Sequence, residues 1–175
     1  MEYFNSDGLK LAYRVEGEGD PIVLVHGFAS THRANWIETG WSRALTDAGF
    51  RVILPDMRGH GASEVCYHAD DYALGAMADD LVALLDHLGE AGADIMGYSM
   101  GAMVALAAAM AHPTRFDRVV AAGVAFVREL FAFLAQILSS SGDKEDSWTW
   151  FFRSTLESLF SILRFSFCLR FHFIA

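Results

Sequence analysis

The sequence predicts an α/β protein with a doubly wound, mostly parallel sheet. Short apolar runs alternate with longer segments in which apolar residues recur at every third or fourth position. These two patterns are typical of strands and of helices, respectively. Several of the short runs are apolar throughout, as expected of strands that a parallel sheet buries on both faces.

Five of the short runs are predicted to be strands. The first covers residues 9–15 and precedes a turn at 16–20 that is rich in glycine and charged residues. The other strands are expected at residues 22–25, 51–54, 93–96 and 118–122.

Three helices are predicted between these strands, at residues 35–48, 72–88 and 100–111. The second has the clearest helical periodicity, because its apolar residues lie three or four positions apart. These residues are Leu74, Met77, Leu81, Leu84, Leu85 and Leu88. The third helix is rich in alanine and is expected to end at His112, because Pro113 cannot continue a helix.

The composition is typical of one globular domain. The chain has 175 residues, of which 53% are hydrophobic and 20% are charged. Its net charge of −9 argues against nucleic acid and anionic membrane surfaces as partners, because both attract Lys and Arg. The amino terminus lacks the features of a signal peptide, and charged residues interrupt the apolar runs, so no transmembrane segment is expected.

The two cysteines, Cys66 and Cys168, are far apart in the sequence and form no CxxC motif. Neither a disulfide framework nor a zinc site is therefore expected, which suits a reducing compartment, and we predict a cytoplasmic protein. The sequence does not indicate an oligomeric state.

Three glycine-containing motifs follow predicted strands: HGFA at residues 26–29, DMRGHGAS at 56–63 and GYSMG at 97–101. In parallel α/β sheets, ligands bind at the carboxyl ends of the strands. The three motifs are therefore expected to meet at one edge of the sheet.

Ser99, in the third motif, is the candidate nucleophile. A serine hydroxyl attacks well only when a base removes its proton. A tight turn from the strand at 93–96 to a helix beginning at Met100 would lift the Ser99 oxygen clear of the sheet. Gly97 and Gly101 would supply the small residues that such a turn requires. A GxSxG motif also occurs as an ordinary glycine-rich turn, but its position between a predicted strand and a predicted helix favours a nucleophile elbow.

A developing oxyanion needs backbone N–H donors. Met100 is a candidate donor, because it begins the helix whose amino end favours negative charge. Phe28, directly after His26 and Gly27, is the natural candidate for the second N–H.

In this order and at these separations, the three motifs resemble those of the α/β-hydrolase superfamily, and most closely its single-domain, lidded, esterase-like branch. The resemblance covers residues 1 to about 124. It implies the α/β-hydrolase fold, and a reaction in which an ester, lactone or related small carbonyl substrate transfers its acyl group to water. It also implies Ser99 as nucleophile and the amides of Phe28 and Met100 as the oxyanion hole, with neither a cofactor nor a metal. A serine at this position excludes the branches of the family that use an aspartate nucleophile, such as dehalogenases and epoxide hydrolases.

Several other polar residues in and near the motifs are expected to be structural. In the family that the chain resembles, the second motif is a structural turn whose Asp and Arg, here Asp56 and Arg58, fix the loop geometry. His60 and Ser63 of this motif are likewise expected to be structural. His26 is expected to support the loop of the oxyanion hole. Four further histidines show no ligand spacing and are expected at the surface or at helix ends; these are His32, His68, His87 and His112.

The family places the acid and the histidine of its triad after the serine in the chain. His172 is the candidate base, because it is the one histidine after His112. Asp143 is the candidate acid and Asp146 the alternative, since an apolar run meets Gly-Asp there, as in the family. Against this assignment, apolar and polar residues alternate over 165–173, which would place His172 inside a strand instead of on a loop.

Residues 1–124 are expected to form the hydrolase core, and 125–175 an atypical, aromatic-rich C-terminal segment. Residues 147–175 hold seven of the 14 phenylalanines, and no proline follows residue 113. This change in composition favours a truncated or frame-altered C-terminal part and a sheet that is incomplete on that side. Two functions therefore remain open: a serine hydrolase, or a catalytically silent α/β-hydrolase fragment that lacks a working acid–histidine pair.

Overall fold

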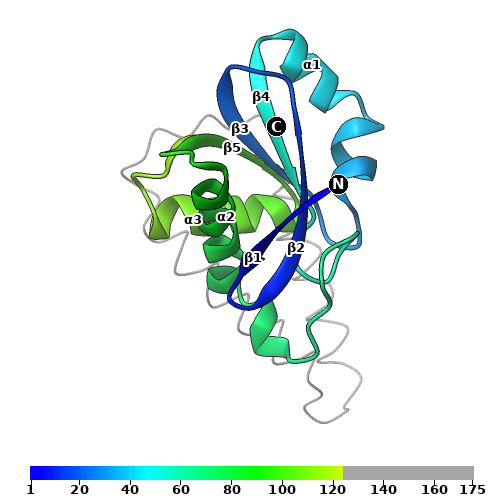
Figure 1. Cartoon of the computed structure of the whole chain (residues 1–175), viewed down its shortest axis with the longest axis vertical. Coiled ribbons are helices and arrows are strands. Elements are labelled where there is room, and N and C mark those ends of the chain that lie inside the picture. Colours follow the sequence, from blue (N-terminus) through cyan, green and yellow to red (C-terminus); the bar gives the residue numbers. More distant parts are fainter. Residues whose placement is uncertain (124–175) are drawn as a thin grey trace.

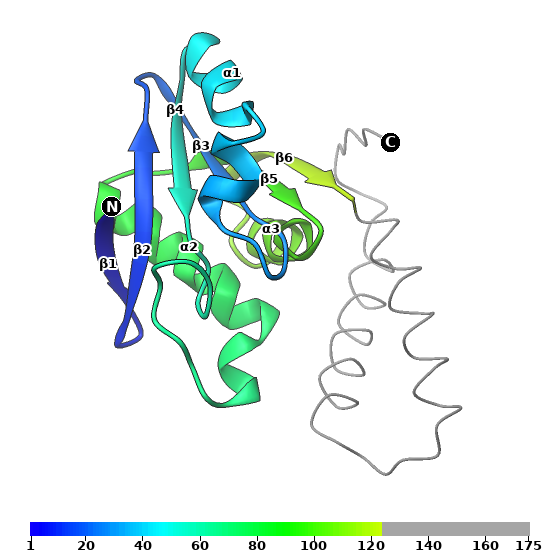
Figure 2. The same ribbon diagram turned by 90° about the vertical axis from the view of Figure 1, so that its right-hand side faces the viewer.

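The computed structural model of the chain describes residues 1–123, and the six strands in this part form one sheet (Figure 1). The strands are β1 (Glu2–Ser6), β2 (Leu9–Glu16), β3 (Asp20–Val25), β4 (Phe50–Pro55), β5 (Ala93–Tyr98) and β6 (Phe116–Ala122). Their order across the sheet is β1-β2-β4-β3-β5-β6, which can be followed in Figure 2. Strands β3, β4, β5 and β6 run parallel, whereas β2 runs antiparallel to both of its neighbours, β1 and β4. The mostly parallel α/β sheet that the sequence predicts is therefore confirmed.

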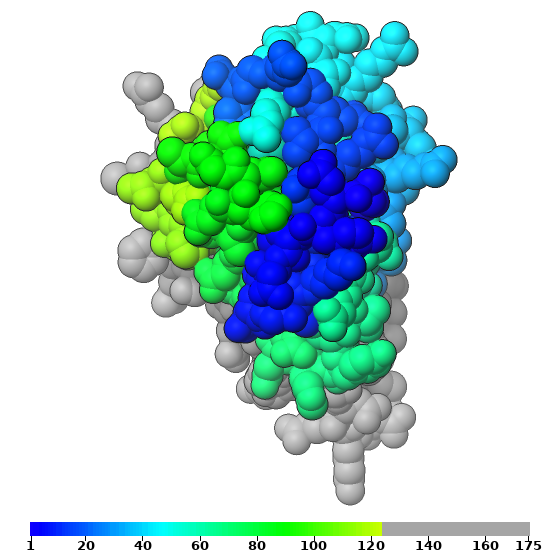
Figure 3. Space-filling view, viewed as in Figure 1, coloured from blue at the N-terminus to red at the C-terminus, as the bar shows by residue number. Residues whose placement is uncertain are grey.

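The helical elements lie between the strands in the chain. They are η1 (Arg33–Ile37), α1 (Trp41–Asp47), η2 (Ala69–Tyr72), α2 (Leu74–Leu88) and α3 (Met100–Ala111). In the space-filling view of Figure 3, the blue atoms of the N-terminal strands lie beside the green atoms of α2, which packs against β1. Within residues 1–123, no helix is long and apolar enough to cross a membrane.

The central strands are buried on both faces, as their continuous apolar runs predict. One core lies between the sheet and helices α2 and α3, and includes Val23, Ile53 and Ile95 from three neighbouring strands. The core on the opposite face includes their sequence neighbours Leu24, Leu54 and Met96, together with Trp36 of η1. Successive side chains of a strand point to opposite faces, so both faces need apolar residues and the alternation typical of a half-exposed strand is lost.

Strand β1 was not predicted from the sequence. This strand pairs with β2 through a two-residue turn in which Asp7 and Gly8 have positive φ angles of 49° and 83°. Such turns match the twist of a hairpin, and Asp-Gly is a favoured sequence for them. The Asp-Gly dipeptide was therefore the signal that could have revealed the hairpin.

The prediction of one helix over residues 35–48 was wrong. The chain makes the single π-helical turn η1 and then the separate helix α1, with Gly40 between them at φ 84° and ψ 0°. After η1, the Thr39 hydroxyl donates a hydrogen bond to the carbonyl oxygen of Asn35 at 2.6 Å, and the first helical segment ends there. The left-handed conformation of Gly40 cannot continue a helix, so the chain changes direction there.

A buried ion pair fastens the loop after β4 to helix α2. The Nε of Arg58 donates to Oδ2 of Asp80, and its Nη2 donates to Oδ1, each at 2.7 Å. The hydroxyl of Ser6 in β1 donates to the same Oδ1 at 2.6 Å. Because one carboxylate joins the hairpin, the loop and α2, its position determines how these three segments fit together.

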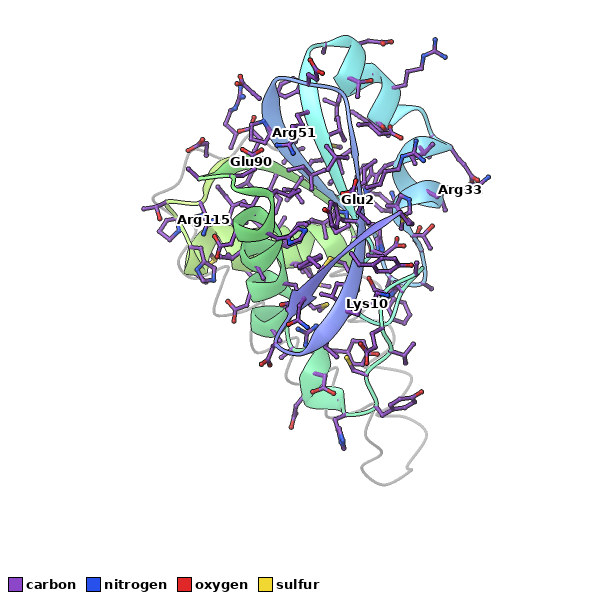
Figure 4. All side chains as sticks on the ribbon, viewed as in Figure 1. Glu2, Lys10, Arg33, Arg51, Glu90 and Arg115 are labelled. Carbon is purple, nitrogen blue, oxygen red and sulfur yellow. The ribbon has the colours of Figure 1, made fainter. Side chains whose placement is uncertain are left out.

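The end of the sheet at which the parallel strands begin is stabilised by other charged side chains. Arg51 at the start of β4 forms an ion pair with Glu90, which follows α2 (Figure 4). Arg115, just before β6, donates to the carbonyl oxygens of Ala91 at 2.9 Å and Glu90 at 3.1 Å. The amino ends of β4, β5 and β6 are thereby linked, and the three motifs lie at the carboxyl ends.

Removing the charge of Asp80 should destabilise the protein strongly. In Asp80→Asn the buried guanidinium of Arg58 loses its counter-ion, and we expect the free energy of unfolding to fall by about 3 kcal/mol or more in urea denaturation. Asp47→Asn is the matched control, because Asp47 and Arg43 form an exposed pair whose loss should cost about 0.5 kcal/mol or less. Equal losses in the two variants would contradict the structural role of Asp80.

Candidate active site

The loops after β3 and β5 begin side by side, because Val25 and Gly97 at the ends of these strands are paired. From this point the chain leaves β3 toward η1 and α1 on one face, and leaves β5 toward α3 on the other. Such a reversal of winding direction leaves a crevice at the carboxyl ends of the strands, where ligands bind in open α/β sheets. A Cβ atom on Gly27 would lie 3.5 Å from Cβ of Ser99, which shows how closely the two loops approach.

Ser99 adopts an unusual backbone conformation at the turn between β5 and α3. Its φ is 55° and its ψ is −115°, a combination that non-glycine residues rarely adopt. Its N–H donates to the carbonyl oxygen of Ala122 at 2.9 Å, and its own carbonyl oxygen accepts from the N–H of Ala102 at 3.0 Å. Within residues 1–123 its side-chain hydroxyl, which is partly exposed, has no hydrogen-bond partner. The backbone is thus held at a strained turn while the hydroxyl remains available.

The two glycines of the third motif are required by close backbone contacts. A Cβ on Gly97 would lie 2.6 Å from the backbone nitrogen of Ala102, and closer still to the carbonyl oxygen of Gly101. A Cβ on Gly101 would lie 2.6 Å from the carbonyl oxygen of His26, and closer still to that of Val25. These neighbours are backbone atoms that cannot turn away, so both positions need glycine for space.

The loop after β3 is held by hydrogen bonds on both sides of Phe28. The N–H of Gly27 donates to Oδ1 of Asn35 at 3.0 Å, and the Gly27 carbonyl accepts from Nδ1 of His26 at 2.8 Å. On the other side, the N–H of Ala29 donates to Nε2 of His60 at 3.3 Å. Ala29 has a positive φ of 53°, so this loop also carries backbone strain.

The amides of Phe28 and Met100 have no hydrogen-bond acceptor in the part of the chain that the structure describes. The Phe28 side chain is 68% exposed and lies edge-on to the His60 ring. Met100 is the first residue of α3, where a helix leaves its N–H groups without intrahelical partners. Both amides are therefore able to bind an external acceptor.

His26 is fully buried beneath this loop. Its Nδ1 is bonded to the Gly27 carbonyl, so this nitrogen carries the proton, and its Nε2 accepts from the N–H of Met57 at 3.0 Å. Burial lowers the pKa of His26 from 6.5 to about 4, because the charged imidazolium would lose its hydration. A neutral ring with both nitrogens bonded to backbone is the structural role that the sequence predicts for His26.

Asp56, at the start of the second motif, organises the loop after β4. Its Oδ1 accepts hydrogen bonds from the backbone N–H of His32 at 2.9 Å and from the Nδ1 of the same residue at 2.8 Å. Its Oδ2 accepts from the N–H of Ala62 at 3.0 Å, and the Ser63 hydroxyl donates to its carbonyl oxygen at 2.6 Å. Burial by itself raises the pKa of Asp56, but the hydrogen bonds from His32 and Ala62 outweigh it and the pKa is lowered.

The position of His32 corrects the sequence analysis, which expected this residue at the surface or at a helix end. His32 is buried against Asp56, which lies 24 positions further along the chain. Nothing in the local sequence marks that contact. The same expectation is confirmed for His68 and His87, which are exposed, and for His112, which ends α3 and pairs with Asp79 at 2.8 Å.

A hollow of about 480 Å³ adjoins the elbow through Tyr98, the residue before Ser99. Its lining is mostly apolar and comes from η1, α1 and the ends of β5 and β6. The lining residues are Ser30, Ala34, Asn35, Trp36, Thr39, Trp41, Met96, Tyr98 and Ala122. Its size and lining suit a small organic group.

Three predicted site residues, Asp143, Asp146 and His172, lie outside the described residues, as does the C-terminal segment at 125–175. Of the predicted site, the structure therefore brings together Ser99, Phe28 and Met100. Residues 1–123 contain no group of three or more His, Cys, Asp or Glu side chains that could hold a metal ion.

A family model described as alpha/beta hydrolase fold matches residues 20–156. The match covers more than half of the chain, which therefore belongs to this family. The family that the motifs resemble is thus confirmed.

Individual relatives carry several names. The chain is 33% identical over 144 residues to an epoxide hydrolase of Caballeronia sordidicola, a match that covers 81% of this chain and 42% of the relative. It is 37% identical over 95 residues to the non-heme chloroperoxidase CPO-A1 of Kitasatospora aureofaciens, covering 54% of this chain and 33% of the relative. The crystal structure of epoxide hydrolase A from Mycobacterium thermoresistibile matches with a TM-score of 0.61 and 31% identity, over 68% of this chain and 37% of the other. The chain spans about two fifths of the length of the first of these relatives.

Filling the space at Gly101 should disrupt the elbow. We expect Gly101→Ala to lower the free energy of unfolding by about 3 kcal/mol, because the new methyl group would overlap backbone at the end of β3. Gly75→Ala is the matched control: no atom lies within 4 Å of a Cβ at that helical position, so the variant should be about 0.5–1 kcal/mol more stable than the parent. Urea denaturation followed by circular dichroism measures both, and a stable Gly101→Ala variant would contradict the packing described.

The lowered pKa of His26 should make the protein less stable in acid. In the unfolded chain His26 takes up a proton near pH 6.5, whereas in the folded chain it does so only near pH 4. The contribution of His26 to the free energy of unfolding is therefore fully present above pH 6.5 and is lost as the pH falls from 6.5 to 4. We expect His26 to contribute a loss of about 3 kcal/mol between pH 7 and 4. His26→Asn should reduce this dependence on pH in urea denaturation, while His68→Asn, at an exposed position, should leave it as in the parent. An unchanged slope in His26→Asn would contradict the assignment.

Proposed function

We propose that the chain carries the nucleophile and the oxyanion hole of a serine hydrolase. The Ser99 oxygen attacks the carbonyl carbon of an ester, lactone or related substrate and gives its proton to the base. The acyl–oxygen bond of the substrate then breaks, and the alcohol group leaves with that proton. Water hydrolyses the resulting acyl-enzyme to the free acid and restores Ser99. The observation that carries this proposal is the strained backbone of Ser99 at a strand-to-helix turn, with its hydroxyl unpartnered within residues 1–123. A structural serine at such a position would gain more from capping the helix that follows, which the Ser99 side chain does not do.

The amides of Phe28 and Met100 are proposed to bind the oxyanion that forms when Ser99 attacks. Support comes from their lack of acceptors in the described part of the chain, and from the approach of the loop after β3 to Ser99. The amino end of α3 adds a partial positive charge at the same place. Two oriented donors of this kind stabilise negative charge on a carbonyl oxygen better than water does.

The base and the acid of the mechanism are proposed to be His172 and Asp143, with Asp146 as the alternative acid. His26 is unsuitable as the base, because both of its ring nitrogens bind backbone groups and its pKa is about 4. The exchange of protons with Ser99 therefore requires another histidine, and His172 follows Ser99 in the chain order of the family.

Ester-like substrates are favoured over epoxides by the chemistry of serine, although most of the similar proteins are named epoxide hydrolases. Attack of a serine oxygen on an epoxide carbon would form an ether, which water and a histidine base do not cleave. Attack on a carbonyl carbon forms an ester that water can hydrolyse with the same base. We therefore propose a carbonyl substrate, with an apolar part that fits the hollow beside Tyr98.

A fluorophosphonate probe tests the proposal, because it forms a covalent bond only with an activated serine. We expect one label per chain on the folded protein, located at Ser99 by mass spectrometry, and its complete loss in Ser99→Ala. Thr114→Ala removes an exposed hydroxyl from the loop between α3 and β6 and should be labelled like the parent.

Absence of labelling in a folded sample would contradict the proposal and favour a catalytically silent fragment. If the parent is labelled, unlabelled parent protein is used to compare hydrolysis of p-nitrophenyl acetate with opening of styrene oxide, and we expect turnover of the ester alone. Opening of the epoxide at a higher rate than hydrolysis of the ester would overturn the assignment to carbonyl substrates.

A further inference from the structure

His60 links the loop after β4 to the loop that carries the proposed oxyanion donor. Its Nδ1 lies 3.0 Å from the carbonyl oxygen of Arg58, and its Nε2 lies 3.3 Å from the backbone nitrogen of Ala29. A carbonyl can only accept and an amide can only donate, so the proton of the neutral ring must be on Nδ1 and Nε2 must be the acceptor. Two main-chain partners thus select one tautomer of His60.

The Arg58 end of this link is well anchored. The guanidinium of Arg58 makes two hydrogen bonds of 2.7 Å to the buried carboxylate of Asp80 on α2. The His60 ring is also confined by packing, with its centroid 5.1 Å from that of His26 and 5.8 Å from that of Phe28. His60 therefore presents Nε2 to the loop after β3 from a fixed position.

The Ala29 end of the link is a strained backbone. At a φ of 53°, Ala29 occupies a conformation that an alanine leaves readily unless neighbouring contacts hold it. Gly27 is held by Asn35 and His26, so the backbone before Phe28 is already oriented. The Phe28 N–H lies in the same peptide plane as the Gly27 carbonyl, which His26 binds. The hydrogen bond from Ala29 to His60 holds the next peptide, so it limits rotation of the Phe28 amide from the other side.

We propose that His60 is a positioning residue for the reaction: by accepting the N–H of Ala29, it keeps the loop in the conformation that points the Phe28 amide at the oxyanion. This inference rests on the proposed function, since it assigns a task to His60 within the same site. His60 itself transfers no proton to the substrate. This role differs from the purely structural one expected for His60 within the second motif. The loop that His60 holds is the loop after β3, which carries the proposed oxyanion donor Phe28.

Two substitutions separate the two hydrogen bonds of His60. In His60→Gln the side-chain oxygen reaches the position of Nε2 and can still accept from Ala29. In His60→Asn the side chain is shorter, reaches only the position of Nδ1, and can bond to Arg58 but not to Ala29. His60→Leu is a second variant without an acceptor, and it keeps an apolar contact with Phe28 in case the Asn variant does not fold.

The rate of fluorophosphonate labelling at saturating probe is the first measurement. We expect it to fall about tenfold in His60→Asn and in His60→Leu, and to stay within about twofold of the parent in His60→Gln. The probe concentration at half-saturation should change little, because the loop acts on the reacting oxyanion more than on probe binding. Equal labelling rates in the parent and both acceptor-free variants, or no recovery in His60→Gln, would overturn the inference.

Amide hydrogen exchange at Ala29, measured by NMR on the full chain, is independent of catalysis. We expect slow exchange in the parent and in His60→Gln, and exchange about tenfold faster in the variants without an acceptor. If the parent is not labelled at all, the proposed function fails, and the exchange data still decide whether His60 holds the loop. Fast exchange at Ala29 in the parent, or slow exchange in every folded variant, would overturn the role of His60.

Discussion

The close packing of the start of α3 against the end of β3 is the constraint on which the rest of the site depends. Gly101 lies against the backbone of Val25 and His26, and no side chain fits between them. This contact brings the amino end of the helix next to the loop after β3, and Ser99 adopts its unusual conformation at this junction. Glycine is therefore needed here because of the space between two segments, more than for its freedom of rotation.

Two buried carboxylates, Asp56 in the loop after β4 and Asp80 on α2, support this arrangement. Asp56 accepts from backbone and side chain of His32 and so holds the end of the loop that follows β3. Asp80 binds Arg58 and thereby fixes the loop after β4 to α2. Both oxygens of each carboxylate accept hydrogen bonds, and such pairing is the condition under which a buried charge organises a structure without destabilising it.

Backbone strain within the described part of the chain is concentrated at the site. The non-glycine residues with positive φ are Asp7, Ala29 and Ser99, and two of these three belong to the loops that meet at the proposed oxyanion hole. Each strained residue has neighbours that hold it: Ser99 is bonded to Ala122 and Ala102, and Ala29 to His60. Rigid support of strained residues would keep the proposed donors and nucleophile oriented before a substrate arrives, and such preorganisation lowers the cost of reaching a transition state.

Local patterns in the sequence determined the strands at the centre of the sheet, helices α2 and α3, and the elbow around Ser99, because periodicity and glycine spacing act over a few residues. The hairpin with β1 escaped prediction although its Asp-Gly turn was a local signal. Only the tertiary structure decided the burial of His32 on Asp56, 24 positions away, and the bond from Ser6 to Asp80 across 74 positions. Such contacts depend on which segments the sheet order brings together, and that order arises from packing of the whole core, which no short stretch of sequence encodes.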